Sequence, residues 1–597
     1  METADTPAVR LNLFLKPQSL IYILTGLLAL LIASIVILSW VPPVSRDALT
    51  HHLAVPKLYL NQGGIFEIPS IKFSYYPMNL DLLYMLPLYF GNDIIPKFIH
   101  FIFALLTAGL IYRYLRKRLD SAWGLLGALF FLSLPIIVKL SITVYVDLGL
   151  VFFSTASLLA LLKWIESRFR FKYLLLSAVC CGLALGTKYN GLIVLFIIAV
   201  SVPPVYLLET KKNLGRENLT DGEKSLTHHW KAVASGAIFV LVALVIFSPW
   251  MIRNYSWKQN PVYPLFNKVF NSPKNISNQM LDGKTEPADH GNQSQISKKS
   301  STRWGPFALR KVIYKESWWQ IALIPVRIFF EGQDDQPKYF DGRLNPFLFL
   351  LPLVAFFRLK SDSPAIRIDK KIFGFFTIFF ILYAFLQTDM RIRYIAPTIP
   401  PLVILAVCGL NNLTALAAER WARAAGWFVP GCTVLLVTLM LLMNAAYIVK
   451  QFEYVDPFSY LGGEIDRNEY IARYRPEYRA FQYANRNLPD DVKVLAIFLG
   501  NRSYYSDREL IFGDNLFKKI VKNSNSSDTI RTEIQRLGIT HLLIRYDIFN
   551  RWSGVQFNEK ERERLSSFLE RNLNPLFSQS GYGLFGLQPG TESSFHP

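Results

Sequence analysis

Long segments without a charged residue recur along the first three quarters of this 597-residue chain. The first of them, Pro17 to Ser45, contains no charge and is long enough to cross a hydrocarbon core of roughly 30 Å as a helix. Inside lipid every backbone polar group must be paired within its own segment, so such segments form spanning helices. The sequence therefore predicts a multi-pass membrane protein, in keeping with 51% hydrophobic residues.

The apolar segments predict about eleven spanning helices. They lie at about residues 18–40, 95–114, 121–138, 146–164, 173–187, 191–208, 233–250, 344–358, 371–387, 395–413 and 425–447. Lys and Arg collect in alternate loops, at residues 113–118, 163–172, 211–224, 358–371 and 420–423. Because cytoplasmic loops carry the excess of basic residues, this pattern predicts a cytoplasmic N-terminus. The first segment lacks a small-x-small cleavage site, which favours a retained helix over a cleaved signal peptide.

This orientation places three sizeable pieces outside the membrane, namely loop 41–94, loop 251–343 and the tail. Residues 76–90 of the first loop are apolar but short, which predicts a helix lying at the outer interface. The polar stretch 271–301 of the second loop has two interpretations, a disordered spacer or a lid that gates substrate entry. We therefore expect a transmembrane domain over residues 1–450.

The tail, residues 451–597, alternates helix and strand patterns and predicts a small extracytoplasmic α/β domain. The expected helices are 476–488, 527–537 and 559–572, and the expected strands are 492–498 and 540–545. The tail has no glycine-rich phosphate loop after a strand, so the sequence assigns it no chemistry.

Several basic residues break the topology rule because they lie at or near the outer ends of helices: Lys139, Lys188, Arg253, Arg391 and Arg393. A charge near membrane depth is costly and usually has a partner. Each alone is typical of a side chain that snorkels to the interface. Together they suit an anionic group held at that depth, and a lipid phosphate is such a group.

Two acidic residues are predicted to lie on the same outer side of the membrane as these basic residues. Asp47 directly follows the first span, and Asp147 interrupts the apolar start of a helix, where an unpaired carboxylate costs several kcal/mol. Acids and bases gathered at one face of the membrane favour a functional site over isolated surface charges.

These residues and their order resemble the GT-C superfamily of glycosyltransferases. The closest group is that of protein O-mannosyltransferases and lipid A aminoarabinose transferases. The similarity covers roughly residues 10–450 and is carried by six short motifs in matching order: Asp47 to Leu53, Tyr75 to Pro77, Tyr145 to Asp147, Gly182 to Lys188, Ser248 to Pro264, and Arg391 to Pro397.

The resemblance implies a GT-C-like fold and a sugar transferred from a polyprenyl-phosphate donor with inversion. Asp47 would be the catalytic base that accepts a proton from the acceptor, and Asp147 would position the acceptor or support charge on the sugar. The donor phosphate would be bound by the cations Lys188, Arg253, Arg391 and Arg393. The acceptor or sugar would be bound by His51, His52, Tyr75 and Tyr145.

The chain departs from the family at two places in the first loop. Protein O-mannosyltransferases tend to have paired Asp and Glu there, whereas this chain has Asp47 followed by Ala48, which puts a protein acceptor in doubt. His51 and His52 stand where other members often have an aromatic residue. Adjacent residues of an α-helix point about 100° apart, so the two imidazoles are poorly placed to share one ion. We predict no cofactor and no obligatory metal.

The implied setting is a bacterial inner membrane with the C-terminal domain in the periplasm. The partners would be membrane lipids, the lipid-linked sugar and a lipid, glycan or protein acceptor, with no nucleic acid. Three alternatives stay open at this point: a ligase that transfers a lipid-linked glycan, a transporter or flippase of lipid-linked sugars, and a structural assembly protein whose tail is the functional part. A transporter predicts an inverted repeat, which the sequence does not display.

Overall fold

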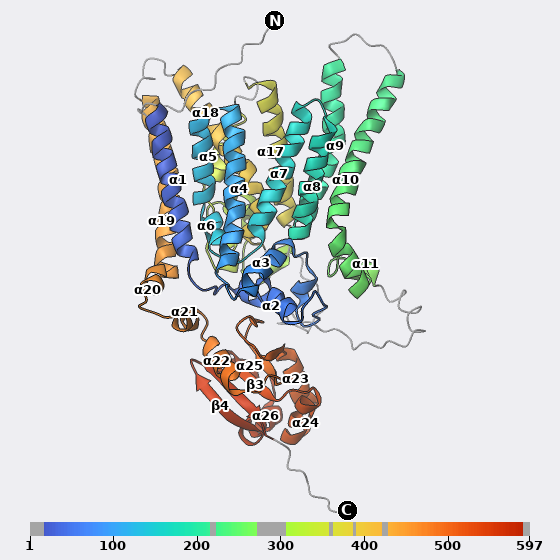
Figure 1. Ribbon diagram of the computed structural model, residues 1–597, viewed down its shortest axis with the longest axis vertical. Helices are drawn as coiled ribbons and strands as arrows, with labels where there is room; N and C mark the ends of the chain where they lie inside the picture. Colours follow the sequence, from blue (N-terminus) through green and yellow to red (C-terminus); the bar gives the residue numbers. More distant parts are fainter. Residues whose placement is uncertain are drawn as a thin grey trace, which may run out of the picture.

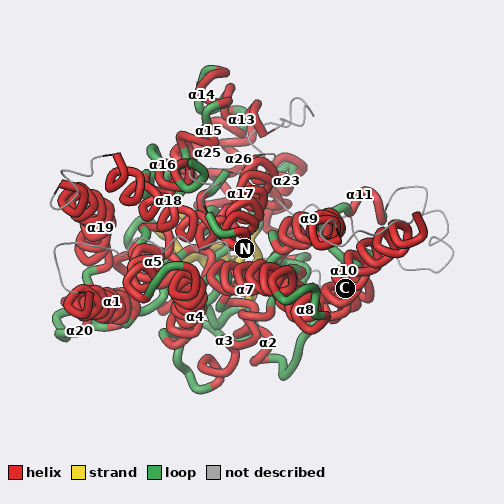
Figure 2. Tube along the Cα trace, turned by 90° about the horizontal axis from the view of Figure 1, so that it is seen from above, coloured by secondary structure: helices red, strands yellow, loops and turns green. Residues whose placement is uncertain are grey.

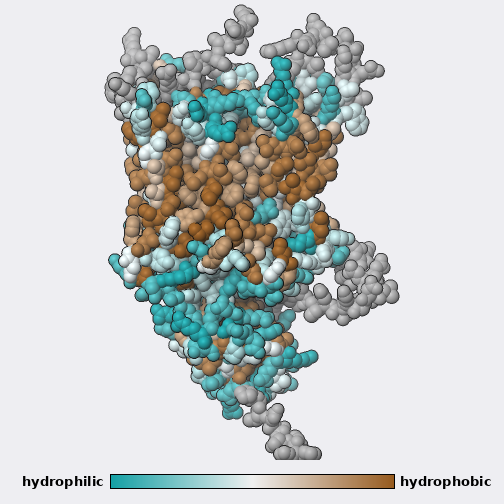
Figure 3. Space-filling model, in the orientation of Figure 1, coloured by the Kyte–Doolittle hydropathy of each residue, from teal (hydrophilic) through white to brown (hydrophobic). Residues whose placement is uncertain are grey.

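The computed structural model describes residues 17–214, 222–271, 306–357, 362–385, 390–420 and 428–588. The molecule has two parts, a bundle of long helices and a small α/β domain that lies below it in Figure 1. Figure 3 shows an apolar band around the helices, bounded by hydrophilic surface at both ends. This distribution is that of a membrane protein with an attached hydrophilic domain.

In the described part of the chain, seven helices are long and apolar enough to cross a membrane. They are α1 (Pro17–Ser39), α4 (Ile95–Arg118), α7 (Asp147–Glu166), α9 (Gly191–Leu214), α10 (Gly222–Lys258), α18 (Ile399–Arg420) with the turn before it, and α19 (Phe428–Val455). Helices α5 (Ser121–Ser133) and α6 (Pro135–Ser141) meet at a bend of 66° and count as an eighth span if taken together.

Eleven spans were predicted, whereas seven or eight helices of the described residues meet the length and composition of a span. Helix α16 (Phe347–Val354) has eight residues, which is too short to cross a hydrocarbon core of roughly 30 Å. Helix α8 (Phe171–Thr187) has 17 residues, at the lower limit for a span, and it leads from the end of α7 at Glu166 back to the start of α7 at Asp147, where Lys188 lies. Helix α17 (Pro364–Phe385) is longer, but four charged side chains lie in its first two turns.

Seen along the bundle, α7 and α17 lie at the centre, with α4, α5 and α18 beside them (Figure 2). Helices α1 and α19 pack together on one side, and α9 and α10 pack together on the other. Helix α8 packs between α7 and α10. The N-terminus of α7, which carries Asp147, lies at the end of the bundle that faces the C-terminal domain (Figure 1).

The first outer loop folds into four short elements beneath the bundle. They are the π-helical turn η1 (Ala48–His52), helix α2 (Ala54–Asn61), the 3-10 turn η2 (Lys72–Tyr75) and helix α3 (Asn79–Tyr89). Helix α3 buries Leu80 and Tyr84 but exposes Leu83 and Leu86, which are 48% and 67% exposed. Apolar side chains on its open face support the prediction of an interfacial helix.

Short helices make up the other outer segments. The second loop contains α11 (Asn267–Phe270), α13 (Pro306–Val312), α14 (Trp318–Ala322), α15 (Ile324–Arg327) and the 3-10 turn η4 (Pro337–Tyr339). Helices α20 (Pro457–Leu461) and α21 (Arg467–Tyr474) connect α19 to the C-terminal domain. The stretch predicted as a spacer or a lid lies outside the described residues from residue 272 onward.

The C-terminal domain is a five-stranded mixed sheet with helices around it, in strand order β2-β1-β3-β5-β4. Its strands are β1 (Lys493–Ile497), β2 (Glu509–Phe512), β3 (His541–Arg545), β4 (Leu573–Gln579) and β5 (Tyr582–Leu587). Its helices are α22 (Tyr478–Asn487), α23 (Asp514–Asn523), α24 (Ser527–Arg536), α25 (Tyr546–Gln556) and α26 (Glu559–Arg571). Strands β1 and β3 and helices α22, α24 and α26 confirm the predicted elements.

Strands β2, β4 and β5 and helices α23 and α25 were not predicted from the sequence. Strand β2 has only four residues, and β4 and β5 contain Pro575, Gly583 and Gly586, residue types that are depleted in strands. Strands β4 and β5 pair with each other and β5 pairs with β3, while β2 pairs with β1 at the opposite edge. Local propensity does not report such non-local pairings.

The C-terminal domain is docked onto the first outer loop by its segment 501–507. The backbone N–H groups of Ser503 and Tyr504 both donate to the carbonyl oxygen of Leu49, each over 3.1 Å. Lys57 donates to the carbonyl oxygen of Tyr504 over 2.9 Å and pairs with Asp507 at 2.8 Å. The domain therefore contacts the turn that follows Asp47.

A second docking contact joins Arg467 of α21 to Asp93 at 2.5 Å, and Asp93 is only 4% exposed. We expect Arg467→Ala to weaken docking by about 1–3 kcal/mol, because a buried carboxylate loses its charged donor. Limited proteolysis of the full-length protein should then cleave faster within residues 456–477. The control is Arg473→Ala on the same helix, whose partner Asp456 is at the surface. Equal cleavage of the two variants would contradict this role for Asp93.

Candidate active site

The turn η1 places Asp47 and two histidines at the end of the bundle that faces the C-terminal domain. It is a π turn, in which the N–H of Leu53 donates to the carbonyl oxygen of Ala48 over 2.9 Å, and Asp47 is the residue at its N-terminal boundary. The wider turn brings the rings of His51 and His52 to a centroid distance of 4.0 Å. The expectation that these rings diverge as on an α-helix is wrong, because a π turn has i→i+5 hydrogen bonds.

Asp47 forms an ion pair with Arg393, whose Nη1 lies 2.6 Å from the carboxylate. Arg393 belongs to the 3-10 turn η5 (Ile392–Thr398) and lies over the rings of Tyr145 and Tyr394, at 5.1 and 5.5 Å. Burial alone would raise the pKa of Asp47, but the guanidinium outweighs it and holds that pKa far below its usual range. The Nε of Arg393 is buried and has no partner among the described residues.

Lys188 and Asp147 form a second ion pair, 2.7 Å apart, at the tip of the α8–α9 hairpin. Asp147 is 1% exposed, and its second carboxylate oxygen has no hydrogen-bond partner within the described chain. Lys188 lies 5.5 Å from the centroid of the Tyr394 ring, which also contacts Arg393. The two ion pairs therefore meet at Tyr394, and Asp47, Lys188 and Arg393 share one cluster.

His52 is bound to an acid that the sequence analysis did not single out. Its Nδ1 lies 2.6 Å from Oδ1 of Asp81, which is buried in the first turn of α3. Burial lowers the pKa of His51 and of His52 to about 3 and raises the pKa of Asp81 to about 7. Between these two pKa values the pair is therefore neutral overall and holds a single proton, on Asp81. The sequence held a sign of this role, because Asp81 is a charged residue within an otherwise apolar interfacial helix.

Two further residues missed from the sequence hold the turn that carries Tyr145 and Asp147. The Nε2 of His100 accepts a hydrogen bond from the backbone N–H of Leu148 over 2.9 Å, so its Nδ1–H donates to backbone carbonyls on the other side. The hydroxyl of Tyr84 donates to the carbonyl oxygen of Tyr145. Neither residue belongs to a motif that reveals this role in advance.

Arg253 lies beside the cluster in an aromatic clamp. Its guanidinium lies 4.5 Å from the ring of Trp250 and 4.9 Å from that of Trp257, and it donates to the carbonyl oxygen of Tyr76 over 3.1 Å. Its Nη1 is buried without a partner among the described residues. Arg253 therefore keeps one donor available for an anion.

Arg391 and Tyr75 have partners away from the cluster. Arg391 pairs with Asp341 at 3.2 Å, in a group of charges that includes Lys139 and Asp334. The hydroxyl of Tyr75 donates to Glu67 over 2.5 Å. The structure thus brings together Asp47, Asp147, Lys188, Arg393, His51, His52 and Tyr145 from the predicted set, and leaves Arg391 and Tyr75 outside it.

The described residues contain no group of three or more His, Cys, Asp or Glu side chains arranged to hold a metal ion. What the cluster offers instead is a carboxylate and several cations within aromatic walls, with buried donors still unused. Such unpaired buried polar groups are rare in folded proteins and mark places where a ligand completes the hydrogen bonding.

Comparison with known proteins supports the resemblance noted in the sequence. Residues 90–252 match the family described as dolichyl-phosphate-mannose-protein mannosyltransferase, which confirms that resemblance for a segment containing Asp147 and Lys188. The segment ends before Arg253 and excludes Asp47 and Arg393. No curated protein sequence is similar enough to this chain to count as a relative.

Solved structures share the fold. ArnT from Cupriavidus metallidurans in the apo state has a TM-score of 0.52 at 13% identity, over 94% of this chain and 98% of that chain. The same protein bound to undecaprenyl phosphate has a TM-score of 0.52 at 14% identity, over 94% and 97%. The oligosaccharyltransferase AglB from Archaeoglobus fulgidus, in complex with an inhibitory peptide and a dolichol-phosphate, has a TM-score of 0.50 at 12% identity, over 94% and 74%.

The shared proton of His52 and Asp81 predicts a specific pH dependence. From about pH 4 to 6.5 the pair of His52 and Asp81 binds one proton in both states. In the folded protein the proton is on Asp81, and in the unfolded chain it is on His52. The pair therefore adds no pH dependence to the free energy of unfolding in this range. In Asp81→Asn the folded protein binds no proton there, so unfolding takes one up. As the pH increases across this window, the free energy of unfolding of Asp81→Asn should rise relative to that of wild type by up to about 1.4 kcal/mol per pH unit.

Thermal unfolding in detergent at several pH values measures this difference. Asp335→Asn is the control, because the Asp335 side chain is 77% exposed and its profile should parallel that of wild type. A profile of Asp81→Asn parallel to wild type would show that Asp81 is ionised in the folded protein.

Proposed function

We propose, from the match of residues 90–252 to the mannosyltransferase family and from the site geometry, that this protein is a membrane glycosyltransferase. It takes a sugar from a polyprenyl-phosphate carrier and transfers it to an acceptor at the outer face of the membrane. The observation that carries the proposal is the cluster in which the Asp47–Arg393 and Lys188–Asp147 pairs meet at Tyr394.

The cations of the cluster suit the leaving group. When the bond between sugar and phosphate breaks, negative charge grows on the lipid phosphate, and preorganised donors in a dry site stabilise that charge strongly. Arg393 and Arg253 each have a buried N–H without a partner in the described chain, and Lys188 adds a compact charge. ArnT and AglB, which share the fold, have been solved with undecaprenyl phosphate and dolichol-phosphate, which supports a lipid-phosphate donor here.

Asp47 suits the role of the base, but its pairing with Arg393 makes it a weak one in the free enzyme. A carboxylate with a strongly lowered pKa accepts a proton poorly. The donor phosphate competes with Asp47 for the guanidinium of Arg393. Binding of the donor therefore loosens the ion pair and raises the basicity of Asp47, which favours an order in which the donor binds before the acceptor reacts.

The reaction then needs one displacement. Asp47 accepts the acceptor's proton, the acceptor oxygen or nitrogen attacks the anomeric carbon, and the bond to the phosphate oxygen breaks with inversion. Because the phosphate leaves as a stable anion, neither a general acid nor a covalent sugar–enzyme intermediate is required. Asp147, held by Lys188, orients the acceptor or supports positive charge on the sugar.

The proposed orientation follows from charge. The basic side chains at the end of α4 bind Glu166 and Asp369 at the end of the bundle opposite the C-terminal domain. By the positive-inside rule this end faces the cytoplasm, so the catalytic cluster and the C-terminal domain lie outside. In a bacterial inner membrane, the outside is the periplasm.

Replacing Asp47 tests the base. Asp47→Asn should lower transfer about 10²–10⁴-fold, the usual contribution of a general base. The measurement is transfer of labelled sugar from a polyprenyl-phosphate donor in membranes that contain the acceptor. Donor binding should persist, because the substitution frees Arg393 rather than removing it. The control is Asp335→Asn, which removes an exposed carboxylate and should transfer sugar as wild type does. Full transfer by Asp47→Asn would show that Asp47 is not the base.

Replacing Arg253 tests the phosphate site. Arg253→Gln should raise the apparent KM for the donor about tenfold, since one charged hydrogen bond to the phosphate is lost. Its stability should fall by about 1–3 kcal/mol, because the carbonyl oxygen of Tyr76 loses a charged donor, so donor KM is measured on folded protein. Lys231→Gln, an exposed position on the same helix, is the matched control. An unchanged donor KM in Arg253→Gln would place the phosphate elsewhere.

A further inference from the structure

The first turn of helix α3 contacts four elements around the catalytic cluster. They are α7, α8, α10 and η1, and the contacts come from the consecutive residues Asn79, Leu80 and Asp81. Consecutive side chains of a helix point about 100° apart, so one turn can reach neighbours in several directions. The turn is thus placed to fix these elements relative to one another.

Asn79 binds the tryptophan that clamps Arg253. The indole N–H of Trp250 donates to Oδ1 of Asn79 over 2.7 Å. Trp250 is 6% exposed, and a buried indole N–H needs such an acceptor because water does not reach it. The ring of Trp250 lies 4.5 Å from the guanidinium of Arg253, which follows three residues later on α10. Asn79 therefore fixes one wall of the clamp that holds Arg253.

The amide of Asn79 also packs against the end of α8. An indole N–H is a donor only, so Oδ1 of Asn79 faces Trp250 and Nδ2 is the atom nearest to Gly186. A methyl group on Gly186 would lie 2.3 Å from that Nδ2, so this position has no room for a side chain. Gly186 lies two residues before Lys188, which directly follows α8. Asn79 therefore contacts the residues that place both Arg253 and Lys188.

The next two residues of α3 contact the elements that carry the acids. A methyl group on Gly149, two residues after Asp147, would lie 2.5 Å from Cδ2 of Leu80. Asp81 binds His52 of η1 at 2.6 Å. The same turn of α3 thus supports both the cations and the acids of the cluster.

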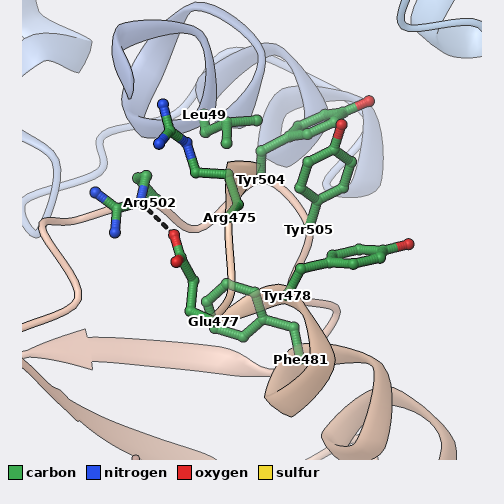
Figure 4. Close-up of a pocket in the computed structure, with 8 residues that line it drawn as sticks. All are labelled: Leu49, Arg475, Glu477, Tyr478, Phe481, Arg502, Tyr504 and Tyr505. Carbon is green, nitrogen blue, oxygen red and sulfur yellow. Dashed lines mark hydrogen bonds and ion pairs between the residues drawn. The ribbon is translucent and has the colours of Figure 1, made fainter. Parts of the chain in front are cut away.

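The turn η1 has a second support besides α3. Figure 4 shows its Leu49 beside Tyr504 and Tyr505 of the C-terminal domain, and the backbone N–H of Tyr504 donates to the carbonyl oxygen of Leu49. The indole of Trp250 has no such second support, because Asn79 is its one acceptor in the described part of the chain. The contacts of Asn79 are therefore the ones on which the two cations depend most directly.

We propose that Asn79 is a positioning residue of the donor-phosphate site, which fixes Arg253 and Lys188 relative to each other. This inference rests on the proposed function and adds the group that sets the spacing of two phosphate-binding cations. Asn79 acts through Trp250 on Arg253 and through Gly186 on Lys188. Both cations then meet the phosphate without a prior rearrangement, which makes their charge most effective.

A double-mutant cycle tests the bond between Asn79 and Trp250. The measurement is the affinity of the full-length protein in detergent for undecaprenyl phosphate, followed by thermophoresis. Asn79→Ala and Trp250→Phe should each weaken binding about fivefold, because each removes the hydrogen bond that fixes the clamp. The double variant should bind no more weakly than the weaker single variant, since both changes break the same bond. Leu86→Ala, at an exposed position of α3, should match wild type.

A matched variant separates positioning from stability. Asn345→Ala also removes a buried asparagine, whose Nδ2 donates to Oδ1 of Asn444 over 2.8 Å and to the carbonyl oxygen of Met440 over 3.0 Å. Asn79→Ala and Asn345→Ala should both unfold at a lower temperature than wild type. Only Asn79→Ala should lose affinity for undecaprenyl phosphate. Equal losses of affinity in the two variants would mean that affinity follows stability, and would overturn the proposal.

The contact with Gly186 is tested by a rescue. Gly186→Ala adds a methyl group against the amide of Asn79 and should weaken binding of undecaprenyl phosphate about tenfold. In Asn79→Ala the three atoms nearest to that methyl group are absent, so adding Gly186→Ala to this variant should weaken binding no further. A further loss in the double variant would show that Asn79 does not link Gly186 to the site.

Failure of the proposed function gives a different result from failure of this inference. A wild-type protein that binds no undecaprenyl phosphate contradicts the proposed donor, and the inference falls with it. Wild-type binding together with unchanged affinity in Asn79→Ala overturns the inference alone. Independent losses in the cycle of Asn79 and Trp250 also overturn it, because the two side chains would then act separately.

Discussion

The central constraint on this molecule is the cost of burying charge at the end of a membrane bundle. Asp147 opens a spanning helix and is almost completely buried, so its carboxylate is tolerable only because Lys188 reaches it from the next hairpin. Arg393 is balanced in the same way by Asp47 from the first outer loop. These two pairs fix the relative positions of α7, the α8–α9 hairpin, η5 and η1. The groups that suit catalysis are therefore also those that hold the elements together.

The pairs are incomplete in a way that suits a ligand. Each leaves buried hydrogen-bonding atoms unused, on Arg393 and Asp147, and Arg253 leaves another nearby. The neutral pair of His52 and Asp81 contrasts with them, because it neutralises itself by sharing one proton. The site thus combines a self-contained pair that supports the turn and ion pairs that an incoming phosphate can rearrange.

Much of the bundle was predictable, because spanning helices follow from apolar segments that any reader of the sequence can find. The count differed where a segment was apolar but its helix short, as in α16, since hydropathy does not report where a helix ends. The grouping of Asp47, Lys188 and Arg393 was predictable only through the family resemblance. The π turn and the Asp81–His52 pair depend on contacts between segments far apart in the sequence, such as that of Leu49 with Ser503. The position of Asp81 in an apolar helix marks it as unusual, but no local pattern names its partner.

The hydrogen bonds that Ser503 and Tyr504 donate to Leu49 also bear on how the protein is made. Ribosomes synthesise the helices first and residues 501–507 near the end, so a chain that is still being inserted has its spans but lacks these two donors. The turn beside Asp47 therefore gains its last support only when that segment has folded against it. In the proposed orientation the segment must first cross the membrane, so the Asp47 turn is completed after the helices have been inserted.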